Sequence, residues 1–226
     1  KKKKAPSSLP DLFEEREKLL TRGYTEGKKA PGRPFVGIPL ALHFSEWLPF
    51  WLEVFRSLGI PVRMSGATNR KTISDGLEAV LAEFCFPVKV AHGHAIELIR
   101  AGVTHLFAPT VLQLPKLRDE YDESVPCPYV STFPHSLAAA VASAGHNVKI
   151  LAPPVDLAGI SRRSARRMHE YFKDLGVTED TMLDALKAGM RAQQAFEKAL
   201  SDRGREVLEK VGADAPAVVI IGRAYN

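Results

Sequence analysis

Apolar residues in this chain recur in two patterns, short continuous runs and longer segments in which they are spaced three or four apart. The run at 34–39 predicts a buried strand. Leu48, Trp51, Phe55 and their neighbours predict a helix over 45–58 that stops at Gly59. The same reasoning predicts further strands at 60–65, 103–108, 129–132 and 147–152, and helices at 74–83, 87–101 and 136–144. This alternation favours an α/β protein with a mainly parallel, Rossmann/flavodoxin-like sheet covered on both faces.

The segments on either side of this pattern differ in character. Residues 1–34 are predicted to form an N-terminal helix over 7–22, capped by Ser7 or Ser8, followed by a Lys/Gly/Pro linker. The α/β domain is predicted to span 35–160. A helical connection over 161–215 follows, split near 176–178. Residues 216–226 read as the first strand of a second α/β unit, truncated here, so we expect that unit to continue beyond the sequence.

Composition restricts the partners of the chain. Its 226 residues are 45% hydrophobic, and no apolar run approaches the roughly 18 residues that a membrane-spanning helix needs. The N-terminal lysines are not followed by the apolar core of a signal peptide, so we expect a cytoplasmic protein. The net charge of +5 is concentrated in 1–4 and 162–167, where solvated faces are a better interpretation than nucleic-acid binding.

The two cysteines are the most informative candidates for chemistry. Cys85 lies just before Pro87, which suits the first turn of a helix, and Cys127 directly precedes Pro128. A thiol ahead of a helix start lies near unpaired N–H groups, which favour the thiolate that binds metals. Two cysteines could also be inert core thiols, the commoner case, or a redox pair. Their number and spacing do not match a structural zinc site.

Other polar residues cluster near Cys85. Lys89 and His92 are three apart on the predicted helix, so they share a face that can point back toward the cysteine. His94 points elsewhere and is a poor joint ligand with His92. Alternatively, His92 packs against the sheet with its ring nitrogens hydrogen-bonded. Gly93 between the two histidines indicates close backbone packing.

Phosphate-binding and hydrolytic motifs are not evident. The sequence has no Walker motif and no G-x-G-x-x-G motif. Residues 65–71 could offer N–H groups and a cation to an anion, although an ordinary strand-to-helix turn explains them equally well. Catalytic residues are therefore unknown at this stage.

Several segments, read together, resemble the activase-related domain of 2-hydroxyacyl-CoA dehydratase systems, which is associated with BadF/BcrA-type ATPase modules. The most specific is the Cys-Phe-Pro-x-Lys…His-Gly-His segment at 85–94. The others are 36–42, 49–59, 107–109, 127–130 and 220–226. Ala224 stands where the family commonly has proline.

This resemblance implies an iron–sulfur-binding domain that takes part in ATP-driven, low-potential electron transfer to an acyl-CoA dehydratase or reductase. It implies a 4Fe–4S cluster with Cys85 and Cys127 as ligands and Lys89 and His92 as supporting groups around it. Any further ligand would come from missing sequence, a second subunit of a possible homodimer, or a non-protein group. The partner would be the ATPase module of the full-length protein or a reductase subunit. ATP hydrolysis is not expected from this chain, and neither is autonomous enzymatic activity. The alternative is a cluster-free docking or CoA-like ligand-binding domain of the same multidomain protein.

Overall fold

The computed structural model describes residues 9–116, 118–120, 124–211, 218, 221–223 and 225. Its main sheet is entirely parallel and has the strand order β2-β1-β3-β5. The strands are β1 (Val36–Ile38), β2 (Val62–Met64), β3 (His105–Phe107) and β5 (Lys149–Leu151). Strand β2 lies on one side of β1 and β3 on the other, and β5 then follows β3, as in flavodoxin-like sheets. The predicted α/β class is confirmed.

Two further strands form a second, two-stranded sheet that continues the β3–β5 pair. They are β4 (Thr110–Gln113) and β6 (Pro154–Asp156), which pair in parallel. Each follows a main-sheet strand after a short break, and the N–H of Thr110 donates to the carbonyl of Pro153 at 2.9 Å. Neither strand was predicted, because Pro109 and Pro153 directly follow the apolar runs predicted as strands.

The strand predicted at 129–132 is wrong. These residues belong mostly to a short helix, α5 (Pro128–Ser131), for which Cys127 is the N-cap residue. Tyr129 and Val130 favour strands, but the fixed φ of Pro128 starts a helical turn. The N–H groups of Val130 and Ser131 both donate to the carbonyl of Cys127, at 2.8 and 3.0 Å.

The longer helices occur where the apolar spacing predicts them, with shifted ends. They are α1 (Leu12–Leu20), α2 (Phe44–Ser57), α3 (Arg70–Ala79), α4 (Phe86–Arg100), α6 (Phe133–Ser143), α7 (Arg162–Phe172) and α8 (Glu179–Leu208). Asp11 caps α1, whereas Ser7 and Ser8 lie outside the described residues. Helix α3 starts four residues earlier than predicted because Asn69 accepts from the N–H groups of Lys71 and Thr72.

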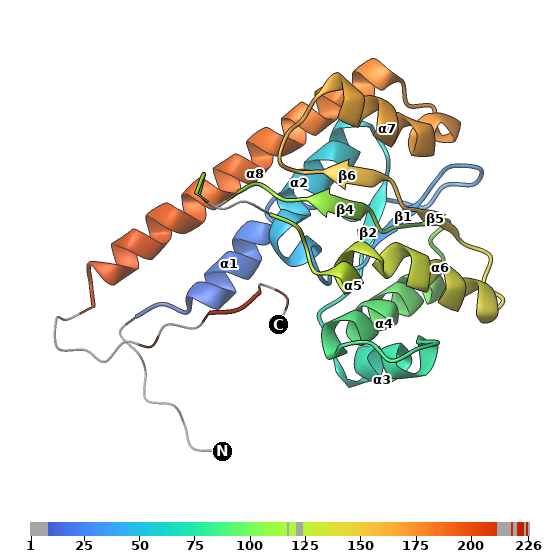
Figure 1. Cartoon of the computed structure of the whole chain (residues 1–226), viewed down its shortest axis with the longest axis horizontal. Helices are drawn as coiled ribbons and strands as arrows, with labels where there is room; N and C mark the ends of the chain where they lie inside the picture. The colour runs from blue at the N-terminus through green and yellow to red at the C-terminus, as the bar shows by residue number, and fades with distance from the viewer. Residues whose placement is uncertain are drawn as a thin grey trace.

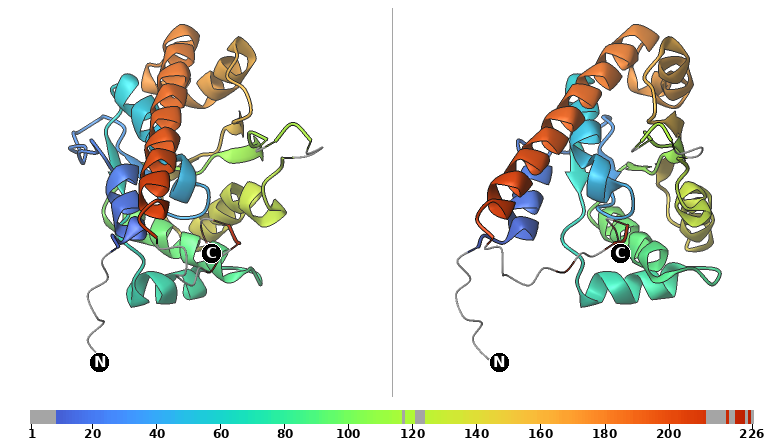
Figure 2. Two further views of the ribbon diagram at one scale, coloured as in Figure 1. Left: turned by 90° about the vertical axis from the view of Figure 1, so that its left-hand side faces the viewer. Right: turned by 60° about the vertical axis from the view of Figure 1, so that its left-hand side comes forward.

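The helices cover the main sheet in two layers (Figures 1 and 2). Helices α2 and α7 lie on one face, with α8 packed against them, and α4 and α6 lie on the other, with α3 packed against α4. The side chains of β1 alternate accordingly: Val36 and Ile38 belong to the core beneath α2, while a Cβ on Gly37 would meet Leu98 of α4 at 3.2 Å. Both faces of the sheet are therefore buried, as the continuous apolar strands predict.

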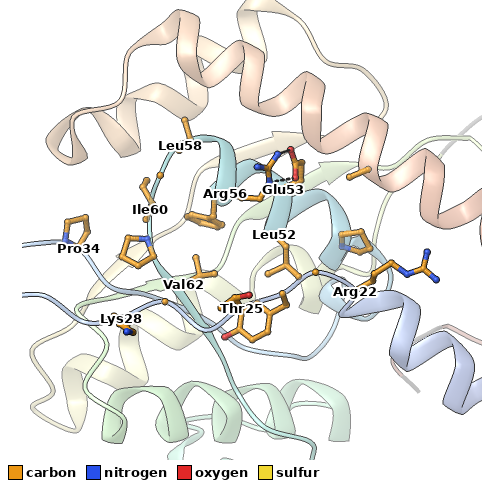
Figure 3. A pocket seen from close by; sticks show the side chains of 18 of the residues that line it. Arg22, Thr25, Lys28, Pro34, Leu52, Glu53, Arg56, Leu58, Ile60 and Val62 are labelled. Atoms are coloured by element: carbon orange, nitrogen blue, oxygen red, sulfur yellow. Dashed lines mark hydrogen bonds and ion pairs between the residues drawn. The ribbon is translucent and has the colours of Figure 1, made fainter.

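Residues 21–34 run past the N-terminal ends of β1 and β2. They form one wall of the groove drawn in Figure 3. Residues 27–33 were predicted to be a linker, yet this segment is attached to the edge of β2. The N–H of Gly27 donates to the carbonyl of Val62 at 2.8 Å, and the N–H of Met64 donates to the Tyr24 hydroxyl at 3.0 Å.

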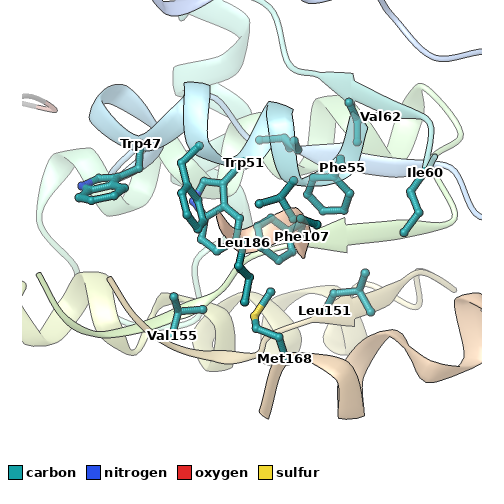
Figure 4. Packing of buried hydrophobic residues seen from close by; sticks show 14 of the residues in the cluster. Trp47, Trp51, Phe55, Ile60, Val62, Phe107, Leu151, Val155, Met168 and Leu186 are labelled. Carbon is teal, nitrogen blue, oxygen red and sulfur yellow. The ribbon is translucent and has the colours of Figure 1, made fainter. Parts of the chain in front are cut away.

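An aromatic cluster forms the centre of the larger core (Figure 4). Phe107, at the end of β3, lies edge-on to Trp51 and Phe55 of α2, with ring centroids 4.7 and 4.9 Å away. Phe172 of α7 packs against both Phe55 and Phe107. These contacts join the sheet to α2 and α7 in one core.

The strand predicted at 216–226 stays a prediction. Most of its residues lie outside the described part of the chain. No helix in the described ranges is both long and apolar enough to cross a membrane.

Acid should destabilise the fold through His43, the residue just before α2. Its ring is buried against Phe44 with a centroid separation of 4.2 Å, and burial lowers its pKa to about 3. The unfolded chain, with a His pKa of about 6.5, binds a proton that the native state does not bind. The contribution of His43 to the free energy of unfolding is therefore fully present above about pH 6.5. It falls toward pH 3, by at most about 1.4 kcal/mol per pH unit.

Urea unfolding at a series of pH values between 7 and 4 checks this. His43→Leu should flatten the slope, whereas His135→Gln, at an exposed site, should keep it. Burial also lowers the pKa values of His92 and His94, so part of the slope should remain in His43→Leu. An unchanged slope in that variant would contradict the assignment to His43.

Candidate functional site

The candidate site lies at the edge of the sheet where the strands end. The strand order changes direction between β1 and β3, and the crevice outside such a point is the usual ligand site of an open parallel sheet. The chain leaves β1 through Leu42, which has a φ of +53°. A non-glycine residue in this left-handed region is strained, and such strain is concentrated at functional sites.

Cys85 occupies the N-cap position of α4, with Pro87 in the first turn, as the sequence predicts. Its side chain makes no capping hydrogen bond, and the residue is exposed. The thiol is therefore at the positive end of a 15-residue helix and open to a ligand.

Cys127 has the same local arrangement. It is the N-cap residue of α5, with Pro128 in the first turn, and its thiol also makes no capping hydrogen bond. Cys127 is partly buried and packs at the margin of the core cluster beneath α4. Both cysteines are free thiols, not a disulfide.

Aromatic contacts bring the two cysteine segments together. Phe84, next to Cys85, lies edge-on to Tyr129, two residues after Cys127, with ring centroids 5.8 Å apart. Tyr225 provides a second link near the end of the chain. Burial raises the pKa of its phenol, Arg223 lowers it, and electrostatic interactions with Cys127 and Cys85 raise it. Both sulfurs therefore lie within electrostatic range of one phenol.

Lys89 is placed close to Cys85 but already has a partner. Its Nζ lies 2.7 Å from Oε2 of Glu83, and this ion pair lowers the pKa of the Glu83 carboxyl. Only 19% of the Lys89 side chain is exposed, against 94% for Glu83. The ammonium group is thus held beside the segment that carries Cys85.

His92 points into the core. Its Nδ1–H donates to the carbonyl of Val88 at 2.8 Å, and Nε2 lies 3.4 Å from the hydroxyl of Ser136. Burial lowers its pKa, so the ring is neutral at pH 7. The ring also stacks on Phe84 with centroids 5.9 Å apart. This is the packed arrangement that the sequence offered as the alternative for His92.

A small cavity of about 220 Å³ adjoins the start of α4 and was not foreseen from the sequence. Leu42, Thr68, Phe86, His94 and Tyr225 are among the residues that line it. His94 Nε2 lies 2.9 Å from the Thr68 hydroxyl, while its Nδ1 has no hydrogen-bond partner among the described residues. The His-Gly-His motif could have drawn attention to His94, but nothing in the sequence indicates its neighbours.

Metal ligands are few at this site. Within the residues that the structure describes, no three His, Cys, Asp or Glu side chains come together in a metal-binding group. Two exposed or half-buried thiols with no capping bond are compatible with a soft metal or an iron–sulfur cluster, but they complete neither.

The fold and this site define a parallel α/β domain with two free cysteines at the edge where its strands end. The family model described as "CoA enzyme activase uncharacterised domain" matches residues 35–226, so the chain belongs to that family. The predicted relationship to activases is confirmed at this level. No curated protein and no solved structure matches the chain.

Proposed function

We propose that this domain holds an iron–sulfur cluster through Cys85 and Cys127 and serves ATP-driven, low-potential electron transfer in an activase system. The observation that carries the proposal is that two free thiols lie in neighbouring segments. Each is the N-cap residue of a helix that has a proline in its first turn. The family relationship supports an ATPase module or an acyl-CoA dehydratase as the general class of partner.

The residues of the chain prepare both thiols for ligation. Cys85 lies at the N-terminus of α4, the positive end of the helix dipole, where a negatively charged ligand set is favoured. Stacking of His92 on Phe84 and the edge contact of Phe84 with Tyr129 position the two segments. A bound cluster would supply one-electron redox chemistry at this edge of the sheet.

Lys89 and His92 have different supporting roles in this proposal. Lys89 carries a positive charge near Cys85 that offsets the negative charge of ligated thiolates, an effect that Glu83 moderates. His92 is neutral and acts by positioning Phe84, not by charge. The remaining ligands would come from outside the described residues, from a second subunit or from a non-protein group.

Iron and acid-labile sulfide in the protein purified under strictly anaerobic conditions, with a visible spectrum of the same sample, test the proposal. We expect iron and sulfide in equal amounts, about four of each per cluster, and a brown chromophore. A colourless protein that stays free of iron after anaerobic reconstitution would contradict it.

The second candidate function is a cluster-free domain that binds a CoA-like ligand or docks a partner. It is favoured by the cavity beside α4, which is lined by the hydrogen-bonded side chains of Thr68 and His94. Its 220 Å³ would admit a small group of a ligand. This function predicts binding without iron, so the same anaerobic sample distinguishes the two.

A further inference from the structure

A second concave surface lies at the opposite edge of the sheet from the cysteines. It is a groove of about 1040 Å³ at the N-terminal ends of β1 and β2, between the segment 19–34, α2 and α8 (Figure 3). It shares no lining residue with the small cavity beside α4. The volume is at the upper end of the range for small-molecule sites.

The floor of the groove is apolar. Phe55 of α2, Ile60 and Val62 at the start of β2, and Phe196 of α8 are buried residues that line it. Leu52 and Leu58 add partly buried apolar surface from α2 and its end. A ligand that fills this space gains mainly by covering the apolar surface that Leu52 and Leu58 still expose.

The rim is basic. Arg22, Lys28 and Arg33 are exposed lining residues, and none of them pairs with an acidic side chain in the described part of the chain. Arg56 also lines the groove, but its guanidinium is bound by both carboxylate oxygens of Glu53, at 2.6 and 2.7 Å. The three cations without acidic partners give the groove a net positive charge.

The basic rim is fixed to the domain. Alongside the hydrogen bonds of Tyr24 and Gly27 to β2, Arg63 and Glu26 form an ion pair at 3.1 Å. A Cβ on Gly27 would lie 2.6 Å from that of Pro61, so only glycine allows this close approach. A segment fixed in this way loses less backbone freedom when its cations bind a ligand than a loose linker would.

We propose that this groove binds a phosphorylated small molecule with an apolar or aromatic body, the chemistry shared by nucleoside diphosphates and coenzyme A. The Arg22, Lys28 and Arg33 side chains bind the phosphates, because guanidinium and ammonium groups donate charge-assisted hydrogen bonds to phosphate oxygens. The apolar floor receives the body of the ligand. This site is separate from the proposed cluster, so either can exist without the other.

Calorimetric titration of the full chain with ADP and with coenzyme A tests the proposal and separates the two sources. Pyrophosphate and adenosine serve as half-ligands. We expect one of the two whole ligands to bind more tightly than either half and its affinity to fall with added salt. The double variant Arg22→Gln/Lys28→Gln should weaken that binding at least about tenfold.

The matched control is Arg163→Gln/Arg167→Gln, which removes two positive charges from α7, outside the groove. It should bind like the wild type. No binding of ADP or coenzyme A up to about 1 mM would overturn the proposal. Equal weakening in the control, or full affinity in the groove variant, would overturn it as well. None of these outcomes depends on iron.

Discussion

Replacing Gly93 with alanine should destabilise the domain more than an ordinary overpacking substitution, which costs about 1–3 kcal/mol. Gly93 lies on α4 against α3, where an added Cβ would be 1.9 Å from the carbonyl oxygen of Thr72. The contact is reciprocal, since a Cβ on Gly76 of α3 would be 2.1 Å from the carbonyl oxygen of Lys89. The obstacles are backbone atoms, so the two helices must move apart.

Urea denaturation followed by far-UV circular dichroism measures this effect. The matched control is Gly204→Ala, because Gly204 also lies within a helix, α8, and its added Cβ would meet nothing within 4 Å. That control should be neutral or stabilise the protein by up to about 1 kcal/mol. A Gly93→Ala variant as stable as the wild type would show that the helices are less closely packed than the structure indicates.

Displacement of α4 would also reach the site, because Cys85 and Lys89 lie at its start. A partial loss of stability in Gly93→Ala should therefore come with weaker ligand binding at the cysteines. The Gly93→Ala variant thus reports on the position of the site as well as on the packing of α3 against α4.

Replacing Cys85 or Cys127 with serine should abolish iron binding while the fold is kept. Both residues are N-caps, a position at which serine is among the preferred residues, so neither helix start should be weakened. Serine is a poor ligand for iron–sulfur clusters compared with the thiolate it replaces. Iron analysis after anaerobic reconstitution, with circular dichroism on the same samples, measures both effects.

Lys89→Gln is the control for this pair. It removes a nearby charge without removing a ligand, so it should keep iron and change the reduction potential of the bound cluster. Wild-type iron content in both cysteine variants would contradict their assignment as ligands. Loss of iron in Lys89→Gln to the same extent as in the cysteine variants would contradict its supporting role.

Much of the fold could be predicted from the sequence, because its strands and long helices carry strong local patterns. The buried run at 34–39 and the spacing of Trp51 and Phe55 each correspond to an observed element. Gly93 was expected to allow close packing, and its contact with α3 confirms this. The errors occurred where proline changed the meaning of a pattern, as at Pro128, where a strand-like run became a helical turn.

The site was predictable only in part. Cys85 could be placed at a helix start because Pro87 follows it closely. Cys127 could not be assigned to the equivalent position, since the strand propensity of Tyr129 and Val130 obscured the helix. The electrostatic interaction of Tyr225 with both cysteines could not be predicted either, because it depends on residues far apart along the chain.

The sequence by itself determined the α/β class, the helix start at Cys85 and the family resemblance, all of which rest on neighbouring residues and their spacing. Tertiary structure alone decided which distant segments meet: Phe84 with Tyr129, Gly93 with Thr72, and the basic segment 22–33 with the edge of β2. Short-range spacing fixes local conformation, whereas these contacts depend on how the sheet and its two helical layers pack together. Both the cysteine pair and the basic groove are therefore products of the packing.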